Sequence, residues 1–150
     1  MRYLSDFETG QQFSAGPLEV AAEEIIAFAR RYDPQIFHLD AEAAEGTFFK
    51  GLASSGWMTA SLTMRMLVDS GIDIAWGVIG REVETITWPR PVRPGDSLRV
   101  VSEVVEVAPS RSRADRGTIR VRSETFNQND ELVQSMTARL MVPARGVEGA

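Results

Sequence analysis

The chain of 150 residues contains no cysteine and only one histidine. Without cysteine it can form no disulfide bond, bind no metal through thiolates and use no cysteine nucleophile. With one histidine, a zinc site would depend on carboxylates, so we expect no metal. The sequence also lacks a glycine-rich phosphate loop and a GxSxG nucleophile motif, and no redox cofactor is expected.

Long apolar runs and an excess of positive charge are also missing. No run reaches the ~18 apolar residues of a membrane-spanning helix, and the N-terminus turns acidic at Asp6 too early for a secretory signal. Because the formal net charge is −5, we expect neither nucleic acid nor an anionic membrane as the main partner. The missing cysteines suit a reducing compartment, and we expect a cytoplasmic protein.

The composition that remains is that of an ordinary globular domain. Hydrophobic residues make up 43% and charged residues 25% of the chain, a balance typical of one folded domain of this length. We therefore expect a single domain over residues 1–150, with the tail after about residue 143 outside the core.

Two helices are predicted in the first half of the chain. Apolar residues at helical spacing indicate a first helix over 22–32, and Pro34 disfavours helical backbone angles at Asp33. Asp33 should therefore leave the helix and direct its carboxylate toward a cleft. A second helix is predicted over about 55–70. Because it carries only two charges, we expect sheet or a partner subunit on nearly every side of it.

The second half alternates like antiparallel strands. After an entering strand within the first 19 residues, strands are predicted near 76–88, 96–107, 117–127 and 131–142. Gln134 interrupts the otherwise apolar face of the last strand. Short connections favour a four-stranded meander. The expected fold class is α+β, an antiparallel sheet wrapped around a long central helix.

The lone histidine, His38, follows Asp33 by five residues. Imidazole is the side chain that ordinarily titrates nearest neutrality, so in a chain without cysteine this pair is the best candidate for acid–base chemistry on a water molecule. The simplest alternative is a lone surface or capping histidine. Asp40 is a rival carboxylate, which we interpret as the cap of a short helix over 41–44.

The start of the second helix is a further candidate. The first backbone N–H groups of a helix lack an internal partner and carry partial positive charge. Gly56 has no side chain to obstruct a substrate carbonyl, so its N–H is a candidate to stabilise an enolate, unless 54–56 is only a helix cap. Five arginines near predicted turns are candidates to bind phosphates or are solvated loop charges: Arg90, Arg93, Arg111, Arg113 and Arg116.

Together these features resemble the MaoC-like dehydratases, a family that includes the (R)-specific enoyl-CoA hydratases. The resemblance covers about residues 7–142. The family motif of an aspartate, a histidine five residues later and a small residue six positions on corresponds to Asp33, His38 and Ala44. Segments 51–60, 88–96 and 127–128 resemble the start of the family's central helix, its strand-to-turn segment and its late hairpin.

The resemblance implies a hotdog fold, a homodimer formed through the sheets, and an acyl-CoA substrate without a separate cofactor. Asp33 and His38 would together activate water for reversible addition to the double bond of a 2-enoyl-CoA. The Gly56 N–H would polarise the thioester carbonyl. Candidate substrate-binding residues are Ser55, Trp57, Arg90 and Arg93.

The sequence departs from the family's pattern beside both parts of the expected site. Gln35 and Ile36 stand where the strict hydratase motif has Asn-Pro, and Ser55 stands where many members have histidine. These changes leave the acyl group open. Four bulky residues near the expected acyl pocket are interpreted either as a limit on chain length or as core: Trp57, Met58, Met64 and Met66.

Two other functions stay open at this point. A hotdog acyl-CoA thioesterase usually carries its carboxylate on or beside the central helix, where this chain offers only Asp69 near the far end. A non-catalytic acyl-CoA-binding homologue would not need both Asp33 and His38. Hydration of an enoyl-CoA is therefore the leading hypothesis.

Overall fold

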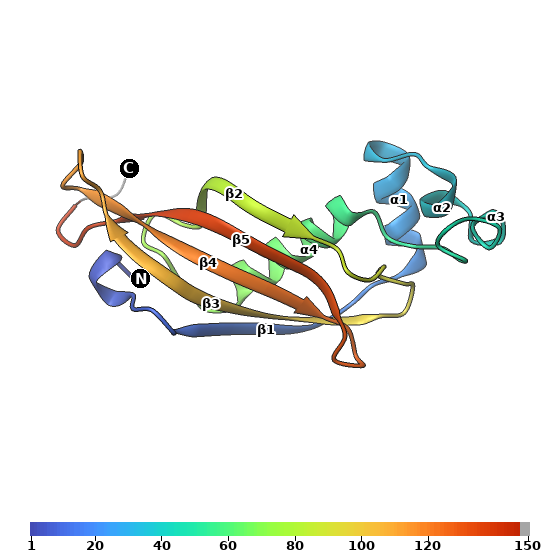
Figure 1. Ribbon diagram of the computed structural model, residues 1–150, viewed down its shortest axis with the longest axis horizontal. Coiled ribbons are helices and arrows are strands. Elements are labelled where there is room, and N and C mark those ends of the chain that lie inside the picture. The colour runs from blue at the N-terminus through green and yellow to red at the C-terminus, as the bar shows by residue number, and fades with distance from the viewer. Residues whose placement is uncertain (148–150) are drawn as a thin grey trace.

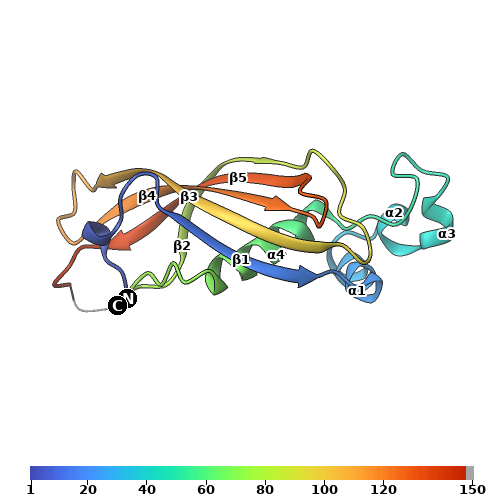
Figure 2. The same ribbon diagram turned by 90° about the horizontal axis from the view of Figure 1, so that it is seen from below.

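A computed structural model of the chain describes residues 1–147. A long antiparallel sheet lies over one long helix, and three further helices gather at one end of the molecule (Figure 1). The N-terminus lies at the opposite end in both views (Figure 2). In chain order the elements are η1 (Leu4–Asp6), β1 (Gln12–Glu19), α1 (Ala22–Tyr32), α2 (Ile36–Leu39), α3 (Ala41–Ala44), α4 (Gly56–Asp69), β2 (Ile79–Thr87), β3 (Ser97–Pro109), β4 (Arg116–Phe126) and β5 (Leu132–Pro143).

The strands follow the order β1-β3-β4-β5-β2, and every neighbouring pair is antiparallel. β3, β4 and β5 form the expected meander. β2 pairs with β5 at the far edge and not with β3, so the prediction of a four-stranded meander is wrong for this strand. The segment 88–96 is rich in proline, which lacks the N–H that a tight hairpin would use. It therefore forms a crossover between distant positions of the sheet.

α4 packs along one face of the sheet, but it is not enclosed. Its buried side belongs to the core between helix and sheet, whereas Trp57 is 61% and Val68 54% exposed. Within the single chain the sheet covers only one side of the helix, so the prediction that sheet or a partner subunit covers nearly every side stays a prediction for the partner subunit. The buried residues of α4 are Met58, Thr59, Thr63, Met66 and Leu67.

A short chain of polar side chains runs through this core. Gln134 of β5 has no exposed surface. Its Nε2 donates to Thr63 Oγ1 at 3.0 Å, and Thr63 shares a 2.6 Å hydrogen bond with the Thr125 hydroxyl. Its Oε1 accepts from Trp88 Nε1 at 2.9 Å. Gln134, the polar residue in the apolar face of β5, is thus buried with both its amide oxygen and its amide nitrogen hydrogen-bonded, as is usual for buried polar groups.

The predicted α+β class is confirmed, and a sheet packed around one central helix is the hotdog fold. No helix within residues 1–147 is long and apolar enough to cross a membrane. After β5 the Ala144 N–H donates to the Asp115 carbonyl, which continues the pairing of β4 with β5, and Arg145 pairs with Asp6. The rest of the predicted tail, 148–150, lies outside the described residues.

Candidate active site

The candidate site lies where α1 ends and the short helices begin. α1 stops at Tyr32, and Asp33 adopts an extended φ of −152° while its N–H still donates to the Ala29 carbonyl. Pro34 disfavours a helical continuation, as the sequence predicted. The Asp33 carboxylate is 18% exposed and faces the cleft.

His38 lies on the one-turn helix α2 and is 5% exposed. Its Nδ1 lies 2.6 Å from the Ala53 carbonyl oxygen. A carbonyl only accepts, so Nδ1 carries a proton and donates it. The other nitrogen, Nε2, lies 3.3 Å from Asp33 Oδ2. Nε2 is therefore the ring atom left to exchange a proton with Asp33 or with a ligand.

Aromatic rings hold the imidazole in place. The Phe37 and His38 rings meet edge to face with centroids 4.6 Å apart, and Phe49 packs on both of them at 4.9 Å and 6.0 Å. The histidine thus sits in an apolar wall with one nitrogen directed to a carboxylate. The alternative of a surface histidine is wrong for this fold, because His38 is buried.

The Asp33 carboxylate is held in its charged form. Burial raises its pKa, but hydrogen bonds from Gln35 and Ser55 and the attraction of His38 outweigh burial, so the pKa of Asp33 lies below its ordinary value. The Gln35 amide donates to Asp33 Oδ1 at 2.6 Å. Asp33 is therefore available as a proton acceptor at neutral pH. Gln35, one of the departures from the strict motif, contributes directly to this state.

Gly56 begins α4 at the same pocket. It is the first helical residue, so its N–H has no partner inside the helix. The Ser55 hydroxyl caps the helix by accepting from the Trp57 N–H at 3.3 Å. A Cβ on Gly56 would come within 2.7 Å of Trp88 Cε2. Glycine is required here because the Trp88 indole lies directly on the start of the helix.

One cavity of about 640 Å³ brings these groups together. It is lined by Asp33, His38, Gly56 and Trp57. Ser55 is 1% exposed and does not line it. Sequence reasoning did not identify the remaining walls as site residues, although the aromatic pair at 48–49 in a loop was a visible signal. Those walls include Phe48, Phe49, Lys50, Ser54, Thr59 and Trp88.

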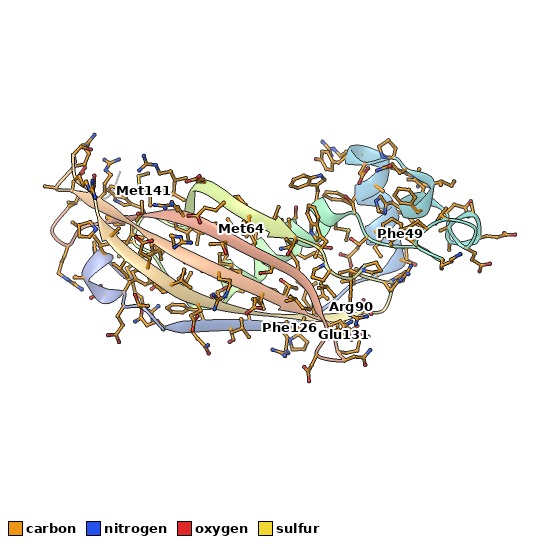
Figure 3. The ribbon with its side chains drawn as sticks, in the orientation of Figure 1. Phe49, Met64, Arg90, Phe126, Glu131 and Met141 are labelled. Carbon is orange, nitrogen blue, oxygen red and sulfur yellow. The ribbon has the colours of Figure 1, made fainter. Side chains whose placement is uncertain are left out.

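The predicted arginines fall into three groups. Arg90 lines the cavity with an exposed guanidinium that pairs with Glu131 at 2.9 Å (Figure 3). Arg93 also lines it, but its guanidinium donates to the carbonyls of Phe49, Gly51 and Leu52 and so fastens the loop. The other three lie in or beside the β3–β4 hairpin, at the end of the molecule away from the short helices (Figure 1).

Within one chain, the hairpin arginines therefore do not reach a ligand bound at the cavity. Asp115 pairs with two of them and neutralises part of their charge. Of the two readings left open for these residues, loop charge fits their position. They are Arg111, Arg113 and Arg116.

The predicted rival carboxylate, Asp40, has the role expected of it. Its Oδ1 accepts a hydrogen bond from the Ala43 N–H at 3.0 Å and caps α3. Asp69, the only acidic residue of α4, pairs with Arg65 at the far end of the helix and does not line the cavity. Asp33 is therefore the only carboxylate among the residues that line the cavity within 1–147.

Residues 6–127 match the sequence model of a family described as the MaoC like domain. The chain belongs to this MaoC-like family. Over 98% of its length it is similar to a MaoC-like dehydratase from Rhodospirillum rubrum, with 46% identity, a TM-score of 0.93 and coverage of 100% of that chain.

Two further proteins are similar at lower sequence identity. The (R)-hydratase PhaJ1 from Pseudomonas aeruginosa is 28% identical, with a TM-score of 0.74, over 95% of this chain and 86% of that one. An uncharacterized protein of Bacillus subtilis strain 168, YdeM, is 32% identical over 127 residues, which are 85% of this chain and 89% of YdeM. The predicted family is thus confirmed, and two of these relatives are named for the removal or addition of water.

Proposed function

We propose that the protein catalyses the reversible addition of water to a 2-enoyl-CoA, giving a 3-hydroxyacyl-CoA. The observation that carries this proposal is the 3.3 Å approach of His38 Nε2 to Asp33 Oδ2 in the cavity that also contains the start of α4. A charged carboxylate, an imidazole nitrogen and a helix amide are the groups that hydration of a conjugated thioester needs.

In the hydration direction, the Asp33 carboxylate takes a proton from water as the water oxygen bonds to the β-carbon. The electron pair of the double bond moves toward the thioester carbonyl, and the pair of Asp33 and His38 delivers a proton to the α-carbon through Nε2. Because the two groups interact directly, they titrate as a coupled pair and each proton belongs to both. The Ala53 carbonyl holds the ring by its Nδ1 proton throughout.

The Gly56 N–H is proposed to donate to the thioester oxygen as negative charge develops on it. This role is supported by its position at the first turn of a helix of 14 residues, where the helix dipole adds partial positive charge. The Trp88 ring on Gly56 shields this donor from water on one side. An amide that is fixed before the reaction stabilises the enolate without reorganisation.

Substitution of the pair tests the proposal. Asp33→Asn and His38→Ala should each lower kcat for hydration of a suitable 2-enoyl-CoA by about 10²–10⁴-fold, the usual contribution of a general acid or base. The loss of the conjugated thioester absorbance measures the rate. Asp40→Asn is the matched control, because asparagine also caps helices, and it should keep wild-type activity. Full activity in both site variants would refute the assignment.

A thioesterase is the second candidate, and the structure does not favour it. Its carboxylate would be expected on the central helix, but Asp69 is half exposed and paired with Arg65 away from the cavity. A thiol-release assay with saturated acyl-CoAs separates the two reactions. Release of coenzyme A at rates comparable with hydration would favour the thioesterase.

A second copy of this chain is the proposed partner. β2 is an edge strand whose outer side pairs with no strand within residues 1–147. Exposed apolar residues lie on it and on the uncovered side of α4, including Val83 at 56% and Val68 at 54%. An unpaired edge beside an apolar surface is a surface that proteins usually cover. A homodimer that extends the sheet at β2 would pair this edge and cover the apolar surface beside it.

A further inference from the structure

A second cavity lies further along α4 than the cavity lined by Asp33 and His38. It has a volume of about 380 Å³ and lies between α4 and β2, over the face of the sheet. Met64 borders it near the middle of the molecule, whereas Phe49 and Arg90 mark the first cavity nearer the short helices (Figure 3). Most of its lining is apolar and includes Ala60, Met64, Leu67, Val83, Met136 and Leu140.

Two tryptophans line the first cavity and do not line the second. α4 and β2 run in opposite directions, so that Gly56 meets Trp88 at one end while Met64 borders the second cavity further along. Trp57 lies one helical turn before Ala60 and on the same side of α4. The rings of Trp57 and Trp88 meet edge to face with centroids 5.4 Å apart, and both line the first cavity. The two indoles in contact therefore lie where α4 begins and β2 has just ended, beside the first cavity.

Gln134 holds one of these indoles in place. The Trp88 Nε1–H donates to its Oε1 at 2.9 Å, and its Nε2 donates to Thr63 in the fully buried core. A buried amide that loses its partner is costly. The indole therefore cannot swing away from Gly56 without leaving the Gln134 oxygen unpaired. Gln134, the polar residue in the apolar face of β5, therefore fixes the position of the Trp88 indole.

We infer that Trp57 and Trp88 close the acyl end of the active site and restrict the substrate to short acyl chains, with Gln134 as the positioning residue for Trp88. The inference rests on the proposed function for the position of the thioester. A longer chain that enters beside His38 and Gly56 would have to pass between the two rings to reach the apolar cavity beyond them. With the rings in contact, additional methylenes find no apolar space.

Binding of saturated acyl-CoAs tests the inference without catalysis. Calorimetry compares butanoyl-, octanoyl- and dodecanoyl-CoA on the wild type and on Trp57→Ala, a change at an exposed side chain. In the wild type, affinity should not rise with chain length. In Trp57→Ala it should rise by about fourfold for each methylene that enters the second cavity. A wild-type affinity that rises with length, or an unchanged profile in the variant, would overturn the inference.

The role of Gln134 is tested by substituting each partner of its hydrogen bond with Trp88. Gln134→Met keeps the size of the side chain and removes the acceptor, and Trp88→Phe keeps a ring and removes the donor. In each variant the affinity for octanoyl-CoA relative to that for butanoyl-CoA should be higher than in the wild type. Trp76→Phe is the matched control, because Trp76 lines neither cavity. If Trp88→Phe behaves like this control, Gln134 is not a positioning residue.

Turnover separates this inference from the proposed reaction. Crotonyl-CoA and 2-octenoyl-CoA are supplied to the same variants, and hydration is followed by absorbance. Trp57→Ala should raise kcat/KM for the longer substrate relative to the shorter one. If no enoyl-CoA is hydrated by the wild type, the proposed function fails, and the calorimetric profile still decides whether the indoles limit chain length.

Discussion

The Arg93 side chain connects the crossover segment to the loop that covers His38. Its guanidinium donates to the carbonyls of Phe49, Gly51 and Leu52. The backbone N–H of Arg93 donates to the Asp96 carboxylate at 2.8 Å. The same loop continues to Ala53, whose carbonyl accepts from His38 Nδ1. We propose that Arg93 orients the histidine through the loop, and the predicted contact of Arg93 with substrate stays a prediction.

Arg93→Lys should separate this role from a phosphate contact. Lysine keeps the charge but cannot present several donors in a fixed plane, so the loop should loosen at a cost of about 1–3 kcal/mol in the free energy of unfolding. We expect kcat for hydration to fall while KM changes little. Arg90→Lys is the control at the exposed cavity rim. A raised KM with unchanged kcat in Arg93→Lys would instead favour contact with substrate.

The types and positions of residues predicted much of the site. The rest of the site depends on contacts between residues that are distant in the sequence. Asp33 and His38 were found because the chain has one histidine and a proline that turns the preceding carboxylate out of its helix. The tasks of Arg93 and Trp88 depend on segments more than 30 residues away. No local pattern reports such partners. Gly56 was identified for its amide, but the indole that demands glycine there was not.

At the scale of elements, periodicity located α1 and α4 to within about two residues of their bounds, and it located β3, β4 and β5 nearly as well. It did not assign β2 to its neighbour. Antiparallel strands carry the same alternating pattern whichever strand they pair with. The position of β2 depends on the crossover at 88–96 and on packing against α4, which are properties of the assembled fold.

The β3–β4 hairpin depends on one carboxylate, which gives a prediction for acid stability. Hydrogen bonding from Arg116 is the largest cause that lowers the pKa of Asp115, from 3.8 to about 2, against the opposing effect of burial. A lowered pKa stabilises the fold fully above the unfolded value, and this stabilisation is lost as the pH falls from about 4 toward 2. Asp115→Asn should therefore lower Tm at neutral pH, with a difference that shrinks in acid.

Thermal unfolding of both proteins across this pH range measures the effect. Asp130→Asn removes the same charge from the β4–β5 turn, where Arg99 is the only ion-pair partner of Asp130 within residues 1–147. This variant controls for the change in net charge. A Tm difference between wild type and Asp115→Asn that stays constant with pH would contradict the assigned role.

At the scale of the whole molecule, the proposed dimer accounts for the uncovered side of α4. Val83→Glu places a charge on β2 beside the second cavity, where Val83 is 56% exposed in the single chain. In a monomer such a change is nearly neutral. In a dimer that covers β2, a buried unpaired charge is strongly unfavourable, so this variant should shift the protein toward monomers.

Light scattering coupled to size exclusion reads the oligomeric state. Ile36→Glu is the matched control, because Ile36 is also exposed, at 50%, but lies on α2 at the end of the molecule. The wild type and this control should have the mass of two chains. A Val83→Glu variant with the same mass as the wild type would argue against an interface at β2.

The pairing of β2 with β5 sets the order in which the protein is completed during synthesis. β2 leaves the ribosome before β3 and β4, yet it finds its only neighbour in the sheet when β5 has emerged. Trp88 follows β2, and the glutamine that anchors it belongs to β5. Asp33 and His38 thus leave the ribosome early, whereas Trp88 gains its partner in the cavity wall only when β5 has emerged. We therefore expect the cavity wall to be complete only when almost all of the chain has been translated.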